Sequence, residues 1–295
     1  MSDLSIPGLP AILFAEECDR GTMRQVNQDS VLHVGIGLGD LMIVADGIGG
    51  ANTGVVSSAQ MAVQLIHSHL AALPSDYPAD KAIGEAVAQA NAKILPVEAD
   101  PAAPQHRVGT AVVVAIVRQE AEGPQAWIGY IGDCRAYLIR AGRLQRLTTD
   151  HSAVQSLLSR SLITQQEVFR HPDTGVLTRS LGVHPEVEIE IEKHPLAVGD
   201  TLLLCSDGLW DFVPEKDIET LANGPTVEAS AHNLLFHALE AGGADNIGIV
   251  MARITETRIL PRKAAQTAVL KWLIVIFLLW VVGLGVLAYK TFWSN

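Results

Sequence analysis

The sequence predicts an α+β fold in which antiparallel β-sheets are covered by helices on their outer faces. Three observations lead to this prediction: apolar runs bounded by Gly-rich turns, segments with helical periodicity, and the order of these elements. The order is strands, two helices, more strands, two helices and a final strand. It lacks the strict alternation of a doubly wound fold and suits antiparallel sheets with helices layered outside them.

The first half of the chain contains strands and the first helix pair. Residues 1–50 read as strands and tight turns, with apolar runs at 11–15 and 41–45 and a Gly-rich hairpin connection at 35–40. Two helices follow, because apolar residues recur there at helical spacing. These residues are Ala59, Val63, Ile66, Leu70 and Leu73 in the first helix, and Ile83, Val87, Ala90 and Ile94 in the second.

The second half adds strands, an irregular segment and the second helix pair. The irregular segment, residues 150–185, is polar and carries a short helical pattern around 157–169. The other elements are strands at 110–117, 126–132, 136–140, 201–207 and 246–254, and helices at 217–221 and 227–239. Together these elements supply an apolar core large enough for one stable domain.

The C-terminal end of the chain is predicted to span a membrane. Residues 272–289 form a run of 18 residues without a charge. As a helix this run is about 27 Å long, close to the apolar thickness of a bilayer. Trp272 and Tyr289 lie at its two ends, where aromatic belts occur. The alternative is a buried core helix, but such helices rarely run this long without a polar face.

Charge around this run sets the expected orientation and domain organisation. The nearby basic residues are Arg258, Arg262, Lys263 and Lys271 before it and Lys290 after it. The positive-inside rule therefore places the N-terminal domain in the cytoplasm. The predicted parts are a globular domain at 1–255, a basic juxtamembrane linker at 256–271, a transmembrane helix at 272–289 and a short tail at 290–295.

Composition excludes several classes of protein. The net charge is −11 and no basic patch is visible, which argues against a nucleic-acid partner. The acidic excess serves solubility, or part of it belongs to a cation site. Cys18, Cys134 and Cys205 are too far apart to form a CxxC zinc pair and do not suggest a disulfide framework. They indicate a reducing compartment.

Carboxylates follow several of the apolar strands. Asp46 and Asp207 each end such a run before a glycine, Asp133 follows a third run, and Asp245 precedes the last strand. Each Asp-Gly alone is better explained by a hairpin turn than by a metal ligand. If the strand ends meet, however, the carboxylates would crowd together and need cations to neutralise them.

Such a crowded site favours particular metals and a particular reaction. Oxygen ligands without a His or Cys cluster select hard ions such as Mg²⁺ or Mn²⁺. Two ions bridged by one carboxylate can activate water for in-line attack on phosphorus. Arg24 lies in a polar loop with Asn27 and Asp29. A guanidinium there could bind a phosphate, although an arginine at the surface is the simpler explanation for this residue alone.

At these residues the chain resembles the metal-dependent protein phosphatases of type 2C, which remove phosphate from serine and threonine. The resemblance covers about residues 12–254, and its motifs occur in the order found in the family. The motifs are RQVNQD at 24–29, VADGIGG at 44–50, VGT at 108–110, IGDCRAY at 131–137, TDHS at 149–152, LTRSLG at 177–182, CSDGLWD at 205–211 and GGADNIGIV at 242–250.

The resemblance implies a four-layer α-β-β-α sandwich, with two antiparallel sheets flanked by helix pairs. It also implies a centre of two Mn²⁺ or Mg²⁺ ions. Asp46 would bridge both ions, the Gly47 carbonyl would bind one of them, and Asp207 and Asp245 would complete the other. Bacterial members often carry a third ion, and Asp133 matches its ligand.

The resemblance also implies roles for residues around the metal centre. Asp29 matches an acid that holds water at the metals, and Arg24 matches the phosphate-binding arginine. The segment 150–185 corresponds to a flap that modulates substrate access. Gln28 stands where the family often has a glutamate, so its hold on the second metal is weaker.

The source of the leaving-group proton is open. Ile48 stands where some members place a histidine that acts as general acid. His151 is a candidate for that role, and a structural hydrogen bond within the TDHS turn is the alternative explanation of this residue.

These implications define the expected function. We expect hydrolysis of phosphoserine and phosphothreonine on proteins, opposing a bacterial serine/threonine kinase at the inner membrane, with the catalytic domain in the cytoplasm. The expected partners are phosphorylated proteins, a kinase and its substrates. The alternatives are a membrane-bound pseudophosphatase, which lost metal aspartates would favour, and a tethered adaptor, which leaves the aspartate pattern unexplained.

Overall fold

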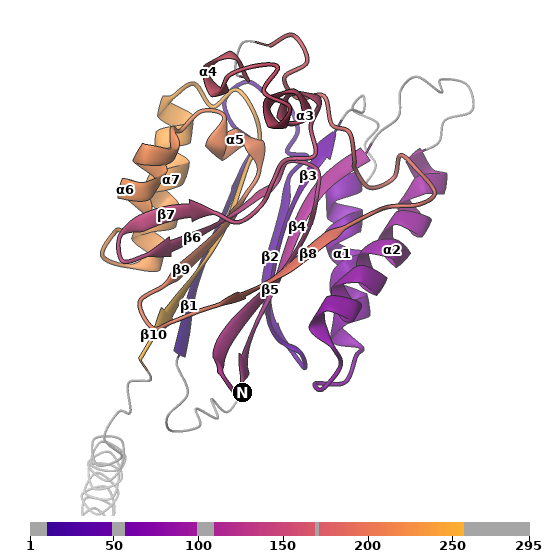
Figure 1. Ribbon diagram of the computed structural model, residues 1–295, viewed down its shortest axis with the longest axis vertical. Helices are drawn as coiled ribbons and strands as arrows, with labels where there is room; N and C mark the ends of the chain where they lie inside the picture. The colour runs from indigo at the N-terminus through magenta and orange to yellow at the C-terminus, as the bar shows by residue number, and fades with distance from the viewer. Residues whose placement is uncertain (1–10, 49–56, 99–108, 169–170, 257–295) are drawn as a thin grey trace, which may run out of the picture. The chain divides into compact units, whose positions relative to one another are not determined.

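The computed structural model describes residues 11–48, 57–98, 109–168 and 171–256 (Figure 1). Their strands form two antiparallel sheets of five strands each. The first sheet has the order β1-β10-β9-β6-β7, with bounds Ala11–Asp19, Ile247–Thr255, Thr201–Cys205, Arg135–Arg140 and Arg143–Arg146. The second has the order β2-β3-β4-β5-β8, with bounds Ser30–Ile36, Gly39–Ile48, Gly109–Glu120, Gly123–Ile131 and Glu190–Pro195.

Helices cover the outer face of each sheet (Figure 1). On the second sheet, helix α1 (Ser58–Ala71) packs its apolar stripe onto β3 and β4, and helix α2 (Ala79–Glu98) packs beside it onto β5 and β8. On the first sheet, α7 (Val227–Glu240) packs onto β1 and β10, and α6 (Glu215–Ala222) packs beside α7 near β7. A third apolar cluster fills the space between the sheets. Central strands therefore have apolar neighbours on both faces, which explains their nearly unbroken apolar sequences.

The predicted α+β class and the two antiparallel sheets are present. The hairpin predicted at 35–40 joins β2 to β3, which pair from Ser30 with Ala45 to Ile36 with Gly39. Several elements differ from the sequence prediction. Strands β7 and β8 were not predicted, and both are edge strands rich in charged residues. The segment 150–185 contains two short helices, α3 (Ala153–Ser159) and α4 (Gln165–Val168).

The pairing of the two ends of the domain places the functional residues. Strand β1 pairs with β10 along its whole length, from Ala11 with Thr255 to Asp19 with Ile247. The loop after β1 consequently lies beside the loop before β10, although more than 200 residues separate them in the chain. Both loops, together with the ends of β3, β5 and β9, lie at one end of the sandwich (Figure 1).

The C-terminal predictions lie outside the described residues. Residues 10–256 form one compact unit, and residues 257–295 contain the predicted membrane span, the tail and nearly all of the basic linker. Within the ranges that the structure describes, no helix has both the length and the apolar character needed to cross a membrane.

Candidate active site

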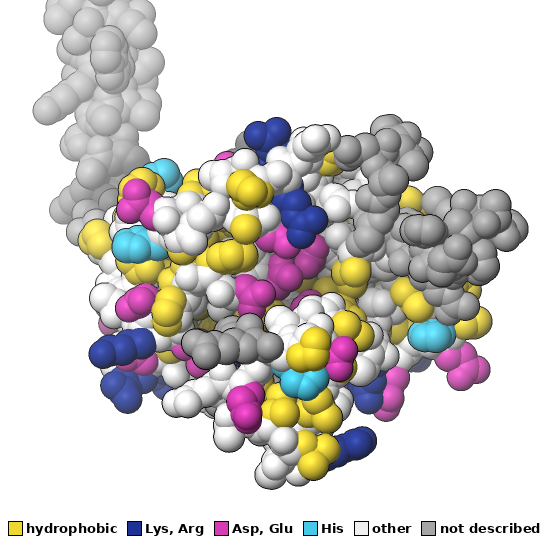
Figure 2. Space-filling view, turned by 90° about the horizontal axis from the view of Figure 1, so that it is seen from above, with side chains coloured by type: hydrophobic (Ala, Val, Ile, Leu, Met, Phe, Trp, Pro, Cys, Tyr) yellow, Lys and Arg dark blue, Asp and Glu magenta, His cyan; other side chains and the backbone are white. Residues whose placement is uncertain are grey.

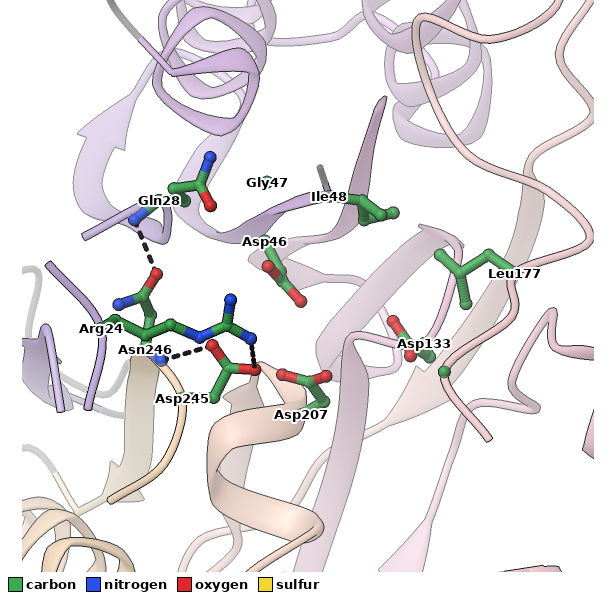
Figure 3. A pocket seen from close by; sticks show the side chains of 11 residues that line it. Arg24, Gln28, Asp46, Gly47, Ile48, Asp133, Leu177, Asp207, Asp245 and Asn246 are labelled. Atoms are coloured by element: carbon green, nitrogen blue, oxygen red, sulfur yellow. Dashed lines mark hydrogen bonds and ion pairs between the residues drawn. The ribbon is translucent and has the colours of Figure 1, made fainter. Parts of the chain in front are cut away.

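A pocket of about 330 Å³ opens at the end of the sandwich where these loops meet. Acidic side chains gather in the middle of this face, beside a basic side chain (Figure 2). The residues that line the pocket are Arg24, Gln28, Asp46, Gly47, Ile48, Asp133, Gly175, Leu177, Asp207, Asp245 and Asn246 (Figure 3). All five predicted metal ligands and the predicted phosphate-binding arginine are among them.

Two of the carboxylates lie in or directly after strands of the second sheet. Asp46 belongs to β3, which continues beyond it to Ile48 rather than ending at the aspartate. Its backbone carbonyl accepts a hydrogen bond of 2.6 Å from the Thr110 hydroxyl on β4. Asp133 lies in the turn between β5 and β6, directly after Gly132, whose φ is +95°. A side chain at Gly132 would be strained at this φ and would collide with Ala111.

The other two come from segments next to the first sheet. Asp207 is the first residue of a short helix, α5 (Asp207–Trp210), and not the last residue of β9 as predicted. Gly208 packs directly on the backbone of Asn246, where any side chain would collide, so this glycine allows Asp207 and Asp245 to lie close together. The glycine of this Asp-Gly pair therefore lets two segments pack closely and does not form a hairpin turn.

Asn246 joins the loops that carry Arg24, Asp29 and Asp245. Its Oδ1 accepts a hydrogen bond of 2.8 Å from the Gln28 backbone N–H. Its Nδ2 donates to the backbone carbonyls of Arg20 at 2.8 Å and Val26 at 3.1 Å. One side chain thus fixes the loop after β1 against the loop before β10. This residue was not singled out from the sequence.

Asp29 lies behind the pocket, against Asp46. Its carboxyl group is buried, and its Oδ2 accepts a hydrogen bond of 2.6 Å from the Ser206 hydroxyl. The Ser206 hydroxyl in turn accepts one of 2.8 Å from the Gly248 N–H. The second oxygen of Asp29, Oδ1, is buried and has no donor among the described residues. A buried oxygen of this kind requires a partner such as water, a proton or a cation.

Burial, together with repulsion between neighbouring carboxylates, raises the pKa values of the carboxyl groups at the pocket. Burial raises the pKa of Asp29 to about 7, and repulsion from Asp207 adds to this effect. Burial also raises the pKa of Asp133 to about 7, with a contribution from Asp150. Burial and repulsion from neighbouring aspartates raise the pKa values of Asp46 and Asp207 well above the ordinary range. A positive charge in the pocket would relieve this repulsion.

Arg24 and Asp245 form the ion pair of the site, with 2.6 Å between Nη2 and Oδ2 (Figure 3). Within the described residues, no three acidic, His or Cys side chains already converge as a complete metal-ligand set. The carboxylates surround the pocket instead, and one of them, Asp245, is paired with Arg24. Their chemistry still fits hard divalent cations, because the donors are oxygens and one buried oxygen lacks a partner.

His151 does not reach the pocket, because it is buried behind the turn that carries Asp133. Its Nδ1 accepts a hydrogen bond of 3.2 Å from the Gly132 N–H, and its Nε2 lies 3.1 Å from Oε1 of Glu190. Its backbone N–H donates to the Gly132 carbonyl at 2.8 Å. Both ring nitrogens are therefore engaged, which favours the structural explanation of this histidine over a general-acid role.

Comparison with known proteins identifies the family. The family model described as protein phosphatase 2C matches residues 21–245. The chain belongs to the protein phosphatase 2C family. This match contains every predicted site residue from Arg24 to Asp245, and it confirms the family expected from the motifs.

Individual relatives in this family are bacterial. The serine/threonine phosphatase Stp of Listeria monocytogenes is 34% identical over 238 residues, which is 79% of this chain and 92% of that protein. The serine/threonine protein phosphatase PstP of Mycobacterium tuberculosis is 34% identical over 245 residues. That alignment covers 82% of this chain but 45% of PstP, so the chain matches under half of that relative.

A solved structure shows the same fold. It is the catalytic domain of PstP in complex with two manganese ions, with a TM-score of 0.71 and 31% identity to this chain. The superposition covers 83% of this chain and 99% of that domain.

Proposed function

We propose that this protein hydrolyses phosphoserine and phosphothreonine on other proteins in a metal-dependent reaction. The observation that carries the proposal is the convergence of four carboxylates and an arginine, from separate segments, on one pocket. Membership of the protein phosphatase 2C family supports the same reaction.

The carboxylates would hold the metal ions. Asp46 and the Gly47 carbonyl, with Asp207 and Asp245 opposite them, are the ligands proposed for two Mn²⁺ or Mg²⁺ ions, and Asp133 suits a third. The manganese complex of the PstP catalytic domain supports this choice. When bound, such ions supply positive charge that acidifies water and neutralises phosphate oxygens.

The protein side chains orient the substrate and the attacking water. Arg24 would leave Asp245 and direct its guanidinium N–H groups to two phosphate oxygens. Asp29, whose Oδ1 is the buried oxygen without a donor, would accept a hydrogen bond from water.

The leaving-group oxygen must regain a proton. The described lining of the pocket contains no histidine, and Ile48 is apolar. We propose that solvent water supplies this proton.

An inactive pseudophosphatase is not favoured. Loss of the metal aspartates would favour that alternative, whereas Asp46, Asp133, Asp207 and Asp245 are all present and all line the pocket. Burial and then repulsion between the carboxylates raise the pKa values of Asp46 and Asp207, a cost that serves no purpose without cations to offset it.

The cellular setting is proposed from the sequence. The uncharged run at 272–289, preceded by basic residues, supports a single-pass anchor with the catalytic domain in the cytoplasm, at the inner membrane of a bacterium. The substrates would be proteins phosphorylated by a serine/threonine kinase, and the kinase itself.

Phosphate release from a phosphothreonine peptide tests the proposal. The full chain with Mn²⁺ should release phosphate, and Asp207→Asn should lose nearly all turnover. Asp217→Asn, an exposed aspartate on α6, is the matched control and should keep wild-type turnover. Equal turnover in Asp207→Asn and Asp217→Asn would show that the reaction does not take place in this pocket.

A further inference from the structure

Two residues behind the pocket, Arg135 and Trp210, connect the turn that carries Asp133 to the helix that carries Asp207. Trp210 is the last residue of α5, whose first residue is Asp207. Its indole Nε1–H donates a hydrogen bond of 3.1 Å to the backbone carbonyl of Asp133. The side chain therefore bridges two segments that each present a carboxylate to the pocket.

Arg135 holds the Trp210 ring in this position. Its guanidinium carbon lies 3.5 Å from the centroid of that ring, which is a close cation–π contact. The same guanidinium makes two hydrogen bonds to Asp150, from Nε to Oδ1 at 3.0 Å and from Nη2 to Oδ2 at 2.6 Å. It makes a third to the Tyr137 hydroxyl at 3.1 Å.

Arg135 and Asp150 are buried, and several contacts hold the Arg135 guanidinium. The side chains of Arg135 and Asp150 are 8% and 7% exposed. A planar guanidinium that is paired on one edge and stacked on one face has few other orientations. Trp210 can then keep its N–H directed at the Asp133 carbonyl. Neither Trp210 nor Arg135 lines the pocket, so neither can bind substrate or metal directly.

We propose that Trp210 and Arg135 are positioning residues that fix the Asp133 carboxylate relative to Asp207, and so set the affinity of the cation held there. The inference rests on the proposed function in that Asp133 is taken as a cation ligand. Groups that orient metal ligands typically change metal affinity or activity about 10–100-fold when they are altered.

A double-mutant cycle on Mn²⁺ binding tests this inference in the full chain. Calorimetric titration of Mn²⁺ would compare wild type, Trp210→Phe, Asp133→Asn and the double variant. Phenylalanine keeps an aromatic ring for Arg135 and loses the N–H. We expect Trp210→Phe to weaken one Mn²⁺-binding step about tenfold, and to have no further effect when Asp133 is already replaced.

Two further variants separate positioning from general destabilisation. Arg135→Lys keeps the charge but loses the paired hydrogen bonds, and should weaken the same binding step. Arg140→Lys is the control, because Arg140 on β6 also binds an aspartate, Asp200, through two nitrogens. It lies outside the pocket lining and should leave Mn²⁺ binding unchanged. Circular dichroism would show that each variant is folded.

Several results would overturn the inference. Unchanged Mn²⁺ binding in folded Trp210→Phe, or equal weakening in the presence and absence of Asp133, would show that Trp210 does not act through that carboxylate. A similar loss in Arg140→Lys would attribute the effect to general destabilisation. Wild-type protein that binds no Mn²⁺ would contradict the proposed function itself, which is a separate outcome.

Discussion

Arg24 and Asp245 are joined by an ion pair of 2.6 Å across the mouth of the pocket. One partner is the residue proposed to bind phosphate and the other is a proposed metal ligand. The side chains are 51% and 28% exposed, so solvent screens the pair and its contribution to stability is small. The pair matters because it couples two binding events. A cation that binds Asp245 and a phosphate that binds Arg24 would each have to replace this same contact.

Replacement of Arg24 tests its role in substrate binding. Arg24→Ala should lower kcat/KM for a phosphothreonine peptide at least tenfold, because a charge-assisted hydrogen bond contributes about 1.5–3 kcal/mol. Arg24→Lys should recover only part of the loss, since lysine cannot form two parallel hydrogen bonds. Arg143→Ala, at an arginine that is 84% exposed, is the control. An Arg24→Ala enzyme with unchanged kcat/KM would make Arg24 an ordinary surface residue.

The same variant makes a second prediction, for metal affinity. Without Arg24 the Asp245 carboxylate loses its competitor, so Mn²⁺ should bind somewhat more tightly. The gain should not exceed about fivefold, because exposed ion pairs contribute roughly 0.2–1 kcal/mol. Calorimetric titration of Arg24→Ala and wild type measures it. Weaker Mn²⁺ binding in the variant would contradict the competition described here.

The raised pKa values predict an unusual pH dependence of stability. In the folded protein the pKa values of Asp29 and Asp133 are about 7, whereas an unfolded aspartate titrates near 3.9. Between about pH 4 and 7 the folded state therefore binds more protons than the unfolded state, so stability falls as pH rises. In EDTA, the Tm should decrease from pH 5 to pH 8.

Two comparisons check that the carboxylates cause this slope. Asp133→Asn removes one of the groups and should flatten the dependence of Tm on pH. Mn²⁺ binds the ionised carboxylates, so at saturating Mn²⁺ the decline towards pH 8 should be smaller or reversed. If Tm depends on pH equally in wild type and Asp133→Asn in EDTA, the Asp133 carboxylate does not cause the decline in stability.

The membrane anchor is tested by fractionation. Full-length protein should sediment with membranes and resist carbonate extraction, because the uncharged run at 272–289 is long enough to span a bilayer. A chain that stops after Glu256, where the compact unit ends, should be soluble and retain activity. Full-length protein in the soluble fraction without detergent would exclude the anchor.

The residues that meet at the pocket could be picked out from the sequence because their signals are local. An apolar run, an aspartate and a glycine are adjacent in the chain at Asp46 and Asp207, and the structure brings both to one pocket with Asp133 and Asp245. The periodicity of the helices was also local, and α7 spans Val227–Glu240 where residues 227–239 were predicted.

The features that were not predicted depend on contacts between distant segments, which no local sequence pattern reveals. Asn246 joins segments more than 200 residues apart, and Ser206 contacts Asp29 across 177 positions. Strand β8 has the sequence EIEKHP, and its charged residues lack a clear strand signal because it is an edge strand. The contact of Trp210 with Asp133 likewise appears only when α5 and the turn before β6 are placed together.

The number of Mn²⁺ ions bound per chain tests the central claim most directly, namely that the clustered aspartates form a metal centre. Equilibrium dialysis followed by metal analysis should find at least two ions per wild-type chain. Asp46→Asn should lose both of them, because Asp46 is proposed to bridge the pair. Fewer than two ions bound to wild type, or two still bound to folded Asp46→Asn, would contradict the account.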